Sequence, residues 1–531
     1  MNVRRYQKWA KSGLAILLAG AMMVGTAASG GGMTAQAAET ESSDTVSTQK
    51  AVTSDAASLL FTEKHITSDL TLPTIGASGT TISWKSSNPS VLSNEGKVTR
   101  PKKGAADEEV TLKGTVKMGD YAKARNFTFV VLAESEMGPT KEFALDQVEL
   151  LDDYYLTAQN SDIEFLKKFD NDRLLSRFRE TAGLDTKKIA PYGGWEDGWL
   201  GGHSVGHYLT AIAQAVKATG NADLKEKSKQ LIEGLAECQN KLGTGFIFGA
   251  KIETEGYVEK QFDILEGKTT GKTWVPWYNM HKMLTGLVDT YKYTGNKQAL
   301  EVAKKLGDWI YNRVSKWDAG TQGRVLGTEY GGMNDCLYEL YLCTRDSKHL
   351  EAAHKFDQPN LYKTVAKGGK NCLNGKHANT TIPKFLGALK RYVVLEQTGE
   401  LTKDDEAYLT NVEKFFDIAV TRHAYITGGV SVMEHFRKDN NQDGTRTQTN
   451  CESCCAHNML KMAKELYKVT GDKKYADYYE TTLRNSIMGA VKSESGAAAY
   501  FIPMATGYFK TFGNEDLSLI HISEPTRLRC I

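Results

Sequence analysis

The spacing of apolar residues along the chain changes once, near residue 138. Before that point, short runs of β-branched and aromatic residues occupy 80–84, 109–116 and 127–132. Asn-Pro, Asn-Glu-Gly and Met-Gly-Asp turns separate these runs, at the spacing of a small all-β domain. We therefore predict a small β-sandwich of the immunoglobulin-like type over residues 59–135.

Beyond residue 138 the apolar residues recur at helical spacing, as in the stripe from Leu284 to Tyr291. Five such stripes end in a turn of the type Thr-Gly-Asn or Thr-Arg-Asp, which a second helical stretch follows. The stretch 143–184 can supply a sixth helical pair. Because the pairs are unevenly spaced and carry long insertions, a closed ring is favoured over a regular solenoid. We predict a mainly α protein, with an (α/α)6 barrel over residues 140–516.

The first 58 residues fit neither pattern. Four basic residues between Arg4 and Lys11 precede an apolar run from Leu14 to Val24 and a small-residue cleavage pattern, Ala35-Gln36-Ala37. This order predicts a signal peptide over residues 1–37, and the apolar run is too short to span a membrane. Residues 38–58 are rich in Ser, Thr, Ala and Asp, and we expect a linker there. The protein is therefore expected to be bacterial, secreted or on the cell surface, without a transmembrane segment.

The charge balance excludes one class of partner. The formal net charge of +2 includes the four basic residues of the leader and no acidic ones, so cleavage of the leader changes it to −2. No basic excess remains to attract nucleic acid or anionic lipid. The sequence leaves the oligomeric state open.

The strongest candidate for chemistry is the run Cys451-Glu452-Ser453-Cys454-Cys455. Thiolates beside a carboxylate form a ligand set that zinc accepts. In an exported protein, thiols persist when they are paired, metal-bound or buried, so a disulfide or buried thiols are the alternatives. The sequence favours a metal for Cys454.

Insertions rich in glycine and aromatic residues precede several of the predicted helices, and histidines follow them. Rings beside neutral polar groups suit a sugar, whose CH face stacks on aromatics while its hydroxyls form hydrogen bonds. His203 and His207 also have the spacing of a zinc pair, but Ser204 stands where a His-Glu-x-x-His site needs glutamate. The predicted substrate-binding residues are Trp195, His203, His207, Trp277, His281 and His377. For each aromatic residue alone, a place in the core is the alternative.

Several ordered strings carry a resemblance to a known family. The region from about 141 to 512 resembles the catalytic domain of glycoside hydrolase families 127 and 146, the β-L-arabinofuranosidases. The matching strings lie at 192–196, 202–209, 274–282, 377–383, 425–429 and 452–454. Residues 83–89, Ser-Trp-Lys-Ser-Ser-Asn-Pro, resemble a bacterial Ig-like domain of the kind appended to secreted glycosidases.

This resemblance implies an (α/α)6 barrel followed by β-sandwich domains, and a zinc ion held by one glutamate and three cysteines. One of those cysteines is the implied nucleophile of a retaining mechanism. Glu452 and Cys454 match the first two zinc ligands, Glu434 matches the acid/base, and the four histidines named above fall at or near sugar-contacting positions. The implied substrate is an oligosaccharide or polysaccharide of plant origin that contains L-arabinofuranose. Zinc would hold a thiol as thiolate, while a carboxylic acid protonates the departing oxygen.

The chain departs from the family pattern after Cys455. The family's two remaining ligands form an adjacent cysteine pair downstream, and no such pair follows Cys455 in this sequence. Residues 517–531 resemble a translated sequencing adapter, so we expect a non-native tail and a truncated chain, and Cys530 is not taken as a ligand. The nucleophile is then absent, and this chain is expected to be inactive.

Two other classes of function remain open at this stage. The first is another (α/α)6 sugar hydrolase, such as an unsaturated glucuronyl hydrolase, which would use paired carboxylates without a metal. The second is a non-catalytic carbohydrate-binding surface protein with a structural zinc ion. The sequence does not specify the linkage or the natural glycan.

Overall fold

The computed structural model describes residues 43–61, 65–66, 69–102, 105–133, 140–250 and 257–513. Its contacts divide the chain into two units, one with α1 and β1–β4 and one with all later elements. The predicted signal peptide, residues 1–37, and the predicted tail, residues 517–531 with Cys530, lie outside the described residues.

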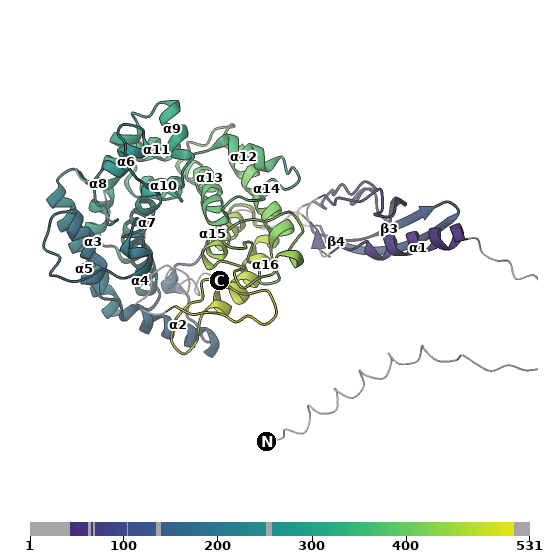
Figure 1. Ribbon diagram of the computed structural model, residues 1–531, viewed down its shortest axis with the longest axis horizontal. Helices are drawn as coiled ribbons and strands as arrows, with labels where there is room; N and C mark the ends of the chain where they lie inside the picture. Colours follow the sequence, from purple (N-terminus) through teal and green to yellow (C-terminus); the bar gives the residue numbers. More distant parts are fainter. Residues whose placement is uncertain are drawn as a thin grey trace, which may run out of the picture. The chain divides into compact units, whose positions relative to one another are not determined.

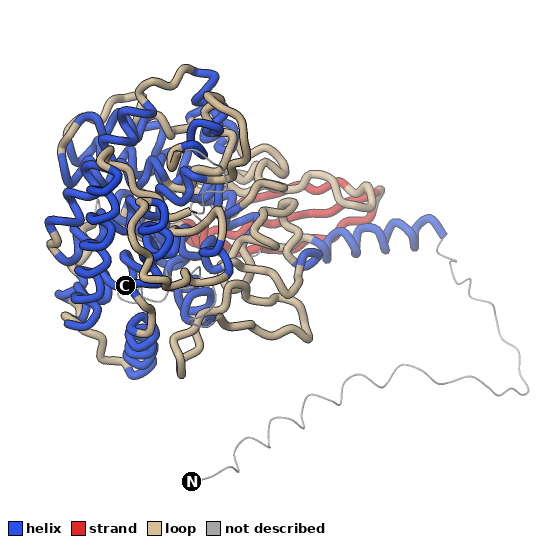
Figure 2. The backbone as a smooth tube through the Cα atoms, turned by 60° about the vertical axis from the view of Figure 1, so that its left-hand side comes forward, coloured by secondary structure: helices blue, strands red, loops and turns tan. Residues whose placement is uncertain are grey.

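The first unit contains one four-stranded sheet, whose strands are drawn in red in Figure 2. The strands are β1 (His65–Ile66), β2 (Thr81–Ser86), β3 (Glu108–Met118) and β4 (Tyr121–Val131), in the order β1-β4-β3-β2. β2, β3 and β4 pair antiparallel, and β1 pairs parallel with β4. Gly119 turns the β3–β4 hairpin with φ +57°, where the sequence places a Met-Gly-Asp turn. The three longer strands lie where the apolar runs predict them.

The stretch expected to be a linker forms helix α1 (Ser43–Ser58), so that prediction was wrong for these residues. Val52, Ala56 and, just beyond the helix, Leu59 are buried, and they cluster with Ile82 of β2 and Val116 of β3. Their i, i+4, i+7 spacing places them on one face, but the stripe is short and made of small side chains. A helix with so few apolar side chains is marginal in isolation, so α1 depends on packing against the sheet.

The second unit is a ring of paired helices, which Figure 1 shows around a common centre. The pairs are α2 (Asp153–Lys167) with α3 (Asn171–Thr181), α4 (His203–Thr219) with α5 (Ala222–Leu242), α7 (Pro276–Thr294) with α8 (Lys297–Val314), α10 (Met333–Thr344) with α11 (Ser347–His354), α13 (Ala378–Thr398) with α14 (Glu406–His423), and α15 (Ser453–Thr470) with α16 (Lys473–Thr482). Short helices α6 (Lys260–Leu265), α9 (Ala319–Leu326) and α12 (Pro359–Ala366) lie in the connections. The ring closes where Ser161 of α2 donates a hydrogen bond to the carbonyl of Ser493. The (α/α)6 barrel is therefore confirmed.

The inner helices end at the turns that the sequence marks. Glycines 220, 295, 399 and 471 follow α4, α7, α13 and α15 in the left-handed conformation, and Arg345 takes the same conformation after α10. The residue before each following helix often caps it, as Asn296 does by accepting a hydrogen bond from the backbone N–H of Ala299 at 3.2 Å. The hairpins therefore follow from local sequence.

Two glycines set the spacing between the first inner helices. A Cβ atom at Gly206 of α4 would lie 2.1 Å from the carbonyl oxygen of Lys282, and one at Gly286 of α7 would lie 2.6 Å from the carbonyl oxygen of Gly206. Only glycine allows this backbone-to-backbone contact. It fixes the starts of α4 and α7, which carry His203, His207 and His281, relative to each other.

The described part of the chain was also searched for membrane-crossing helices. None of its helices combines the length and the apolar character needed to cross a bilayer.

Candidate active site

The predicted site residues gather where the inner helices begin. His203 is the first residue of α4, His377 is the N-cap of α13 and Glu452 is the N-cap of α15. Two contacts join neighbouring helices near their starts. The rings of His203 on α4 and Tyr278 on α7 lie 6.4 Å apart, and Asn458 on α15 donates a hydrogen bond to Asn379 on α13 at 3.2 Å. The helix starts therefore share one end of the barrel.

A tyrosine that the sequence does not single out joins two carboxyl groups at this end. The hydroxyl oxygen of Tyr500 lies 2.5 Å from Oε1 of Glu434 and 2.9 Å from Oε1 of Glu452. Because the hydroxyl has only one proton to donate, the second hydrogen bond needs a proton from a carboxyl group. Burial, with the nearby charge of Glu434, raises the pKa of the fully buried Glu452 to about 7. When no cation is bound, Glu452 therefore holds this proton below about pH 7 and loses it as the pH rises above that value.

Glu434 is the more open of the two carboxyl groups and has a histidine partner. Nε2 of His377 lies 3.1 Å from its Oε2, and about 30% of each side chain is exposed, 29% for His377 and 31% for Glu434. The hydrogen bond from His377 lowers the pKa of Glu434. Burial opposes a charge on His377, but the bond to Glu434 and the charges of Glu329 and Glu452 outweigh it and raise its pKa. The Glu434–His377 pair can therefore hold a proton at a position that solvent reaches.

The backbone around Glu434 is held in an unusual conformation. Met433 has φ +46° and Glu434 has φ +64°, in the left-handed region that residues other than glycine seldom adopt. The backbone N–H of Met433 donates to the carbonyl of Thr449 at 2.8 Å, and the carbonyl of Glu434 accepts from Ala378 at 2.6 Å. Strain of this kind persists where the surrounding structure over-determines it, and it concentrates at functional sites. The loop is tied to both the α13 and the α15 side of the site.

The cysteine run supplies buried thiols rather than disulfides. The cysteines at 451, 454 and 455 are buried and form no disulfide in the described part of the chain. The thiol of Cys455 donates to Oε2 of Glu452 at 3.1 Å. Burial raises the pKa of Cys451 to about 12, and burial with the charge of Glu452 raises that of Cys455. The disulfide alternative is therefore not realised here.

The donor set around Glu452 fits part of a zinc site. A buried carboxylate and a buried thiol, Glu452 and Cys454, are ligands that zinc accepts. Among the described residues, however, Glu452 and Cys454 belong to no group of three His, Cys, Asp or Glu side chains whose ligand atoms all lie within 4.8 Å of one another. These two residues therefore provide two candidate ligands and not a complete site.

His203 is enclosed by a glutamate that the sequence analysis did not use. Its Nδ1 lies 2.8 Å from Oε1 of Glu196, and its side chain has no exposed surface. Glu196 also accepts from the backbone N–H groups of Gly202 at 2.7 Å and Ser204 at 3.1 Å. This arrangement favours a structural, hydrogen-bonded role for His203, which orients the start of α4, over the predicted sugar contact.

His207 lies on α4, about one turn beyond His203, and His281 lies on α7. Burial, then the charge of Lys282, lowers the pKa of each well below the ordinary value. Neutral imidazoles present one donor and one acceptor, as sugar hydroxyls require. Tyr278, whose ring lies 5.7 Å from that of His281, has its pKa raised by burial and by the charges of Cys454, Glu329 and Glu452.

The two predicted tryptophans have different environments. Trp195 is 44% exposed, and its ring lies 6.3 Å from that of Trp274, which is 48% exposed. Two exposed indoles side by side can stack on a sugar. Trp277 is 0% exposed and packs edge-on against Phe262 and Trp317, so its prediction as a substrate contact was wrong. Its neighbour in sequence, Trp274, is exposed instead and lies beside Trp195.

The residues that sequence reasoning missed are Tyr500, Glu196, Tyr278 and Glu329. Tyr500 follows a plain Gly-Ala-Ala-Ala run, which carries no chemical signal. Glu329 lies near the pair of Glu434 and His377, where burial raises its pKa. Glu196 stands inside a glycine- and tryptophan-rich string, and a glutamate seven residues before a helix-starting histidine is the one signal that could have found it.

Comparison with solved structures supports the fold described above. Two similar solved structures are a GH127 β-arabinofuranosidase, with a TM-score of 0.55 and 19% identity, and a GH127 β-L-arabinofuranosidase from Geobacillus stearothermophilus T6, with 0.52 and 16%. They match 73% and 72% of this chain, which spans 60% and 64% of their lengths. At these identities the likeness shows the fold. No curated protein sequence matches the chain.

Family models cover both units. The model of the atrophied bacterial Ig domain matches residues 46–134, which include most of helix α1. The model of the β-L-arabinofuranosidase GH127 catalytic domain matches residues 147–520, well over half of the chain. With its (α/α)6 barrel and its carboxylates at the inner helix starts, the chain belongs to glycoside hydrolase family 127.

Proposed function

We propose that this protein is the catalytic part of a secreted, retaining β-L-arabinofuranosidase that acts on arabinose-containing plant glycans. The observation that carries the proposal is the pair of carboxyl groups on one tyrosine hydroxyl, with Glu434 open to solvent and Glu452 buried beside Cys454. Export through the signal peptide is part of the proposal.

Glu434 is the proposed acid/base. Its carboxyl group must give a proton to the departing oxygen and later take one from water. A lowered pKa leaves it mostly ionised at neutral pH, so the proton must come from a partner. His377, with its raised pKa and its contact at 3.1 Å, is placed to supply it. The substrate oxygen would then approach the exposed edge of this pair.

Glu452 and Cys454 are the proposed zinc ligands within the described residues. Zinc would supply the charge that keeps a cysteine sulfur ionised at neutral pH. Without a cation, burial raises the pKa of Cys451 to about 12, which favours the protonated thiol, and raises the pKa of Glu452 to about 7, so that its carboxyl group is partly protonated at neutral pH. Tyr500 fixes the Glu452 carboxyl group in place by its hydrogen bond.

The chain itself is proposed to lack the nucleophile. No adjacent cysteine pair follows Cys455 in the 531 residues, and two zinc ligands alone give a weak site. The chain should therefore bind sugar but not turn it over. The proposed sugar contacts are the Trp195–Trp274 pair and the neutral rings of His207 and His281.

The binding half of the proposal is tested on the chain as it stands. Titration calorimetry with methyl β-L-arabinofuranoside should detect binding that Trp195→Ala weakens by about tenfold, the value of one lost stacking contact. Tyr154→Ala, which removes an exposed aromatic ring on α2, should leave the affinity unchanged. Equal loss in both variants, or no preference for this sugar over unrelated glycosides, would contradict the assignment.

The catalytic half needs a protein in which the chain continues into an adjacent cysteine pair. There, Glu434→Gln should lower kcat on an alkyl arabinofuranoside by about 10²–10⁴-fold. The loss should be smaller on an aryl substrate, whose leaving group needs no proton. Chelation should abolish activity. Full activity after removal of the metal would instead favour a hydrolase that uses the Glu434–Glu452 carboxyl pair alone, and hydrolysis only of unrelated glycosides would end the proposal.

A further inference from the structure

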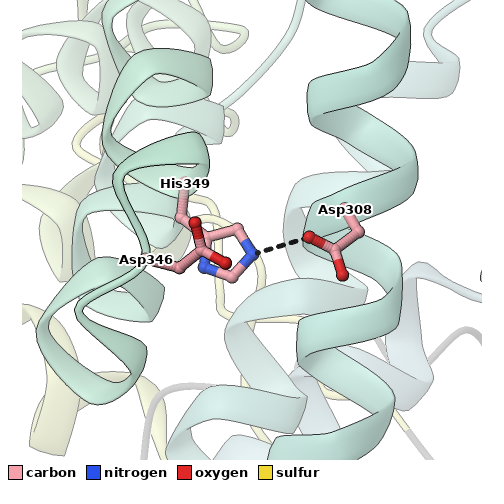
Figure 3. Close-up of side chains that lie close together, drawn as sticks. All are labelled: Asp308, Asp346 and His349. Atoms are coloured by element: carbon pink, nitrogen blue, oxygen red, sulfur yellow. Dashed lines mark ion pairs between the residues drawn. The ribbon is translucent and has the colours of Figure 1, made fainter.

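A second cluster of metal-type side chains lies on the outer helices, apart from the site described above. It consists of Asp308 on α8, Asp346 at the N-cap of α11 and His349 on α11. One ligand atom from each lies within 4.8 Å of the others, and no other group of three meets this distance among the described residues. Figure 3 shows the ring of His349 turned toward the carboxylate of Asp308.

The hydrogen bonds of Thr344 decide which nitrogen of His349 carries the proton. The hydroxyl of Thr344 donates its proton to the carbonyl of Leu340 at 3.0 Å. Nδ1 of His349 lies 2.8 Å from the same hydroxyl oxygen, which can only accept from it. Nδ1 therefore carries hydrogen, and in the neutral ring Nε2 presents a lone pair.

That lone pair faces another acceptor. Nε2 of His349 lies 3.8 Å from Oδ1 of Asp308, and neither atom has a hydrogen-bond partner, although both are buried. His349 has no exposed surface, and burial lowers its pKa, which favours the neutral ring. The Asp308 side chain is 45% exposed, but its Oδ1, like Nε2 of His349, is covered. Two electron pairs that face each other at covered atoms are costly unless a cation lies between them.

We propose that Asp308, Asp346 and His349 form a binding site for a divalent transition-metal ion, with zinc as the best match. One imidazole nitrogen and two carboxylate oxygens suit zinc, and water can complete the coordination. The Nδ1–H contact to Thr344 orients the ring, as outer hydrogen bonds of metal-bound histidines do. Asp346 keeps one oxygen on the backbone N–H of Lys348 at 3.0 Å, which leaves the other available.

The ion would join the outer helices of two neighbouring hairpins, α8 and α11. Because the ligands come together only in the folded protein, binding should raise the unfolding temperature. Lys348 is the natural competitor, since its ammonium lies 3.8 Å from Oδ1 of Asp308 and half of its side chain is exposed. It can turn outward into water when a metal ion binds.

The experiment measures zinc alone bound to chelator-treated protein, by equilibrium dialysis and elemental analysis. Asp308→Asn should weaken one class of zinc site by about tenfold or more, and it should reduce the rise in unfolding temperature on zinc addition. Lys348→Gln should tighten the same site by about fivefold, because it removes a competing charge about 4 Å away. Glu351→Gln, an exposed acid on the same helix, is the matched control and should change neither quantity.

Asp308→Asn and Lys348→Gln test this proposal separately from the candidate zinc ligands Glu452 and Cys454. Glu452 and Cys454 remain intact in both, so zinc bound there is the same in every sample. If wild type and Asp308→Asn bind equal amounts of zinc with equal affinity, the proposal is overturned. If Lys348→Gln weakens zinc binding, the assigned role of that ammonium, and with it the site, is overturned as well.

Discussion

The sharpest test of the candidate active site is Glu452→Gln in the absence of metal. Glu452 is fully buried, and burial raises its pKa from 4.5 to about 7. Glutamine keeps the size of the side chain, an amide N–H that can donate to Tyr500 in place of the carboxyl proton, and an oxygen that can accept from Cys455, but it does not ionise. The substitution therefore removes one titration and leaves the packing nearly unchanged.

The sign of the effect follows from the direction of the shift. A carboxyl group with a raised pKa in the folded state favours folding while it is protonated, below pH 4.5. That contribution is lost as the pH rises through 7. At about 1.4 kcal/mol for each pKa unit, the loss amounts to about 3 kcal/mol. The wild-type chain should thus lose about 3 kcal/mol of unfolding free energy relative to Glu452→Gln between acid pH and pH 8.5.

Urea unfolding followed by tryptophan fluorescence, with chelator present, measures this difference at pH 5, 7 and 8.5. Glu351→Gln serves as the control, since an exposed glutamate on α11 should show no pH-dependent difference from wild type. Added zinc should reduce the pH dependence of the difference between wild type and Glu452→Gln, because a cation stabilises the ionised carboxylate. Zinc bound at Asp308, Asp346 and His349 affects both proteins and cancels in this difference. A constant difference between wild type and Glu452→Gln across this range would refute the reasoning.

Other predictions separate structural residues from functional ones. Trp277→Ala should destabilise the barrel by about 3–5 kcal/mol in urea unfolding, whereas Trp195→Ala should stay within about 0.5 kcal/mol. Arg313→Met should cost about 3–5 kcal/mol by the same assay, because it removes the shared partner of three carboxylates, of which one is fully buried and two are partly buried. Leu59→Ala should destabilise the Ig-like unit by about 2–4 kcal/mol, measured by hydrogen exchange in the β3–β4 hairpin, and Leu60→Ala, at an exposed position, should not. Equal effects of the last two variants would contradict the docking of α1 on the sheet.

Much of the architecture could be predicted because it is local. The turns after α4, α7, α13 and α15 are marked by glycine, and the apolar stripes between them have helical period, so the hairpins follow from short-range sequence. Helix α1 was missed because Val52 and Ala56 are too small to make a strong stripe. Its helix depends on a sheet that lies later in the sequence.

The candidate site could be predicted only in part. Glu434, Glu452 and Cys454 belong to strings that stand out by residue type, and the structure places them where the inner helices begin. Trp277 stands in an equally prominent string, yet it points into the core. A residue's type and spacing do not specify which side of a helix start faces the barrel centre, since that depends on how neighbouring helices pack.

The sequence by itself determined the order of the helical hairpins, the strands of the Ig-like unit and the family. Each of these depends on periodicity or on residues close together in the chain. Only the tertiary structure decided that Tyr500 joins Glu434 to Glu452, that Glu196 holds His203, and that His349 faces Asp308. The first and third of these contacts link residues from separate segments, whose distances and burial are set by how the helices of the ring pack. The contact of Glu196 with His203 spans only seven residues, but it depends on the turn that buries both side chains.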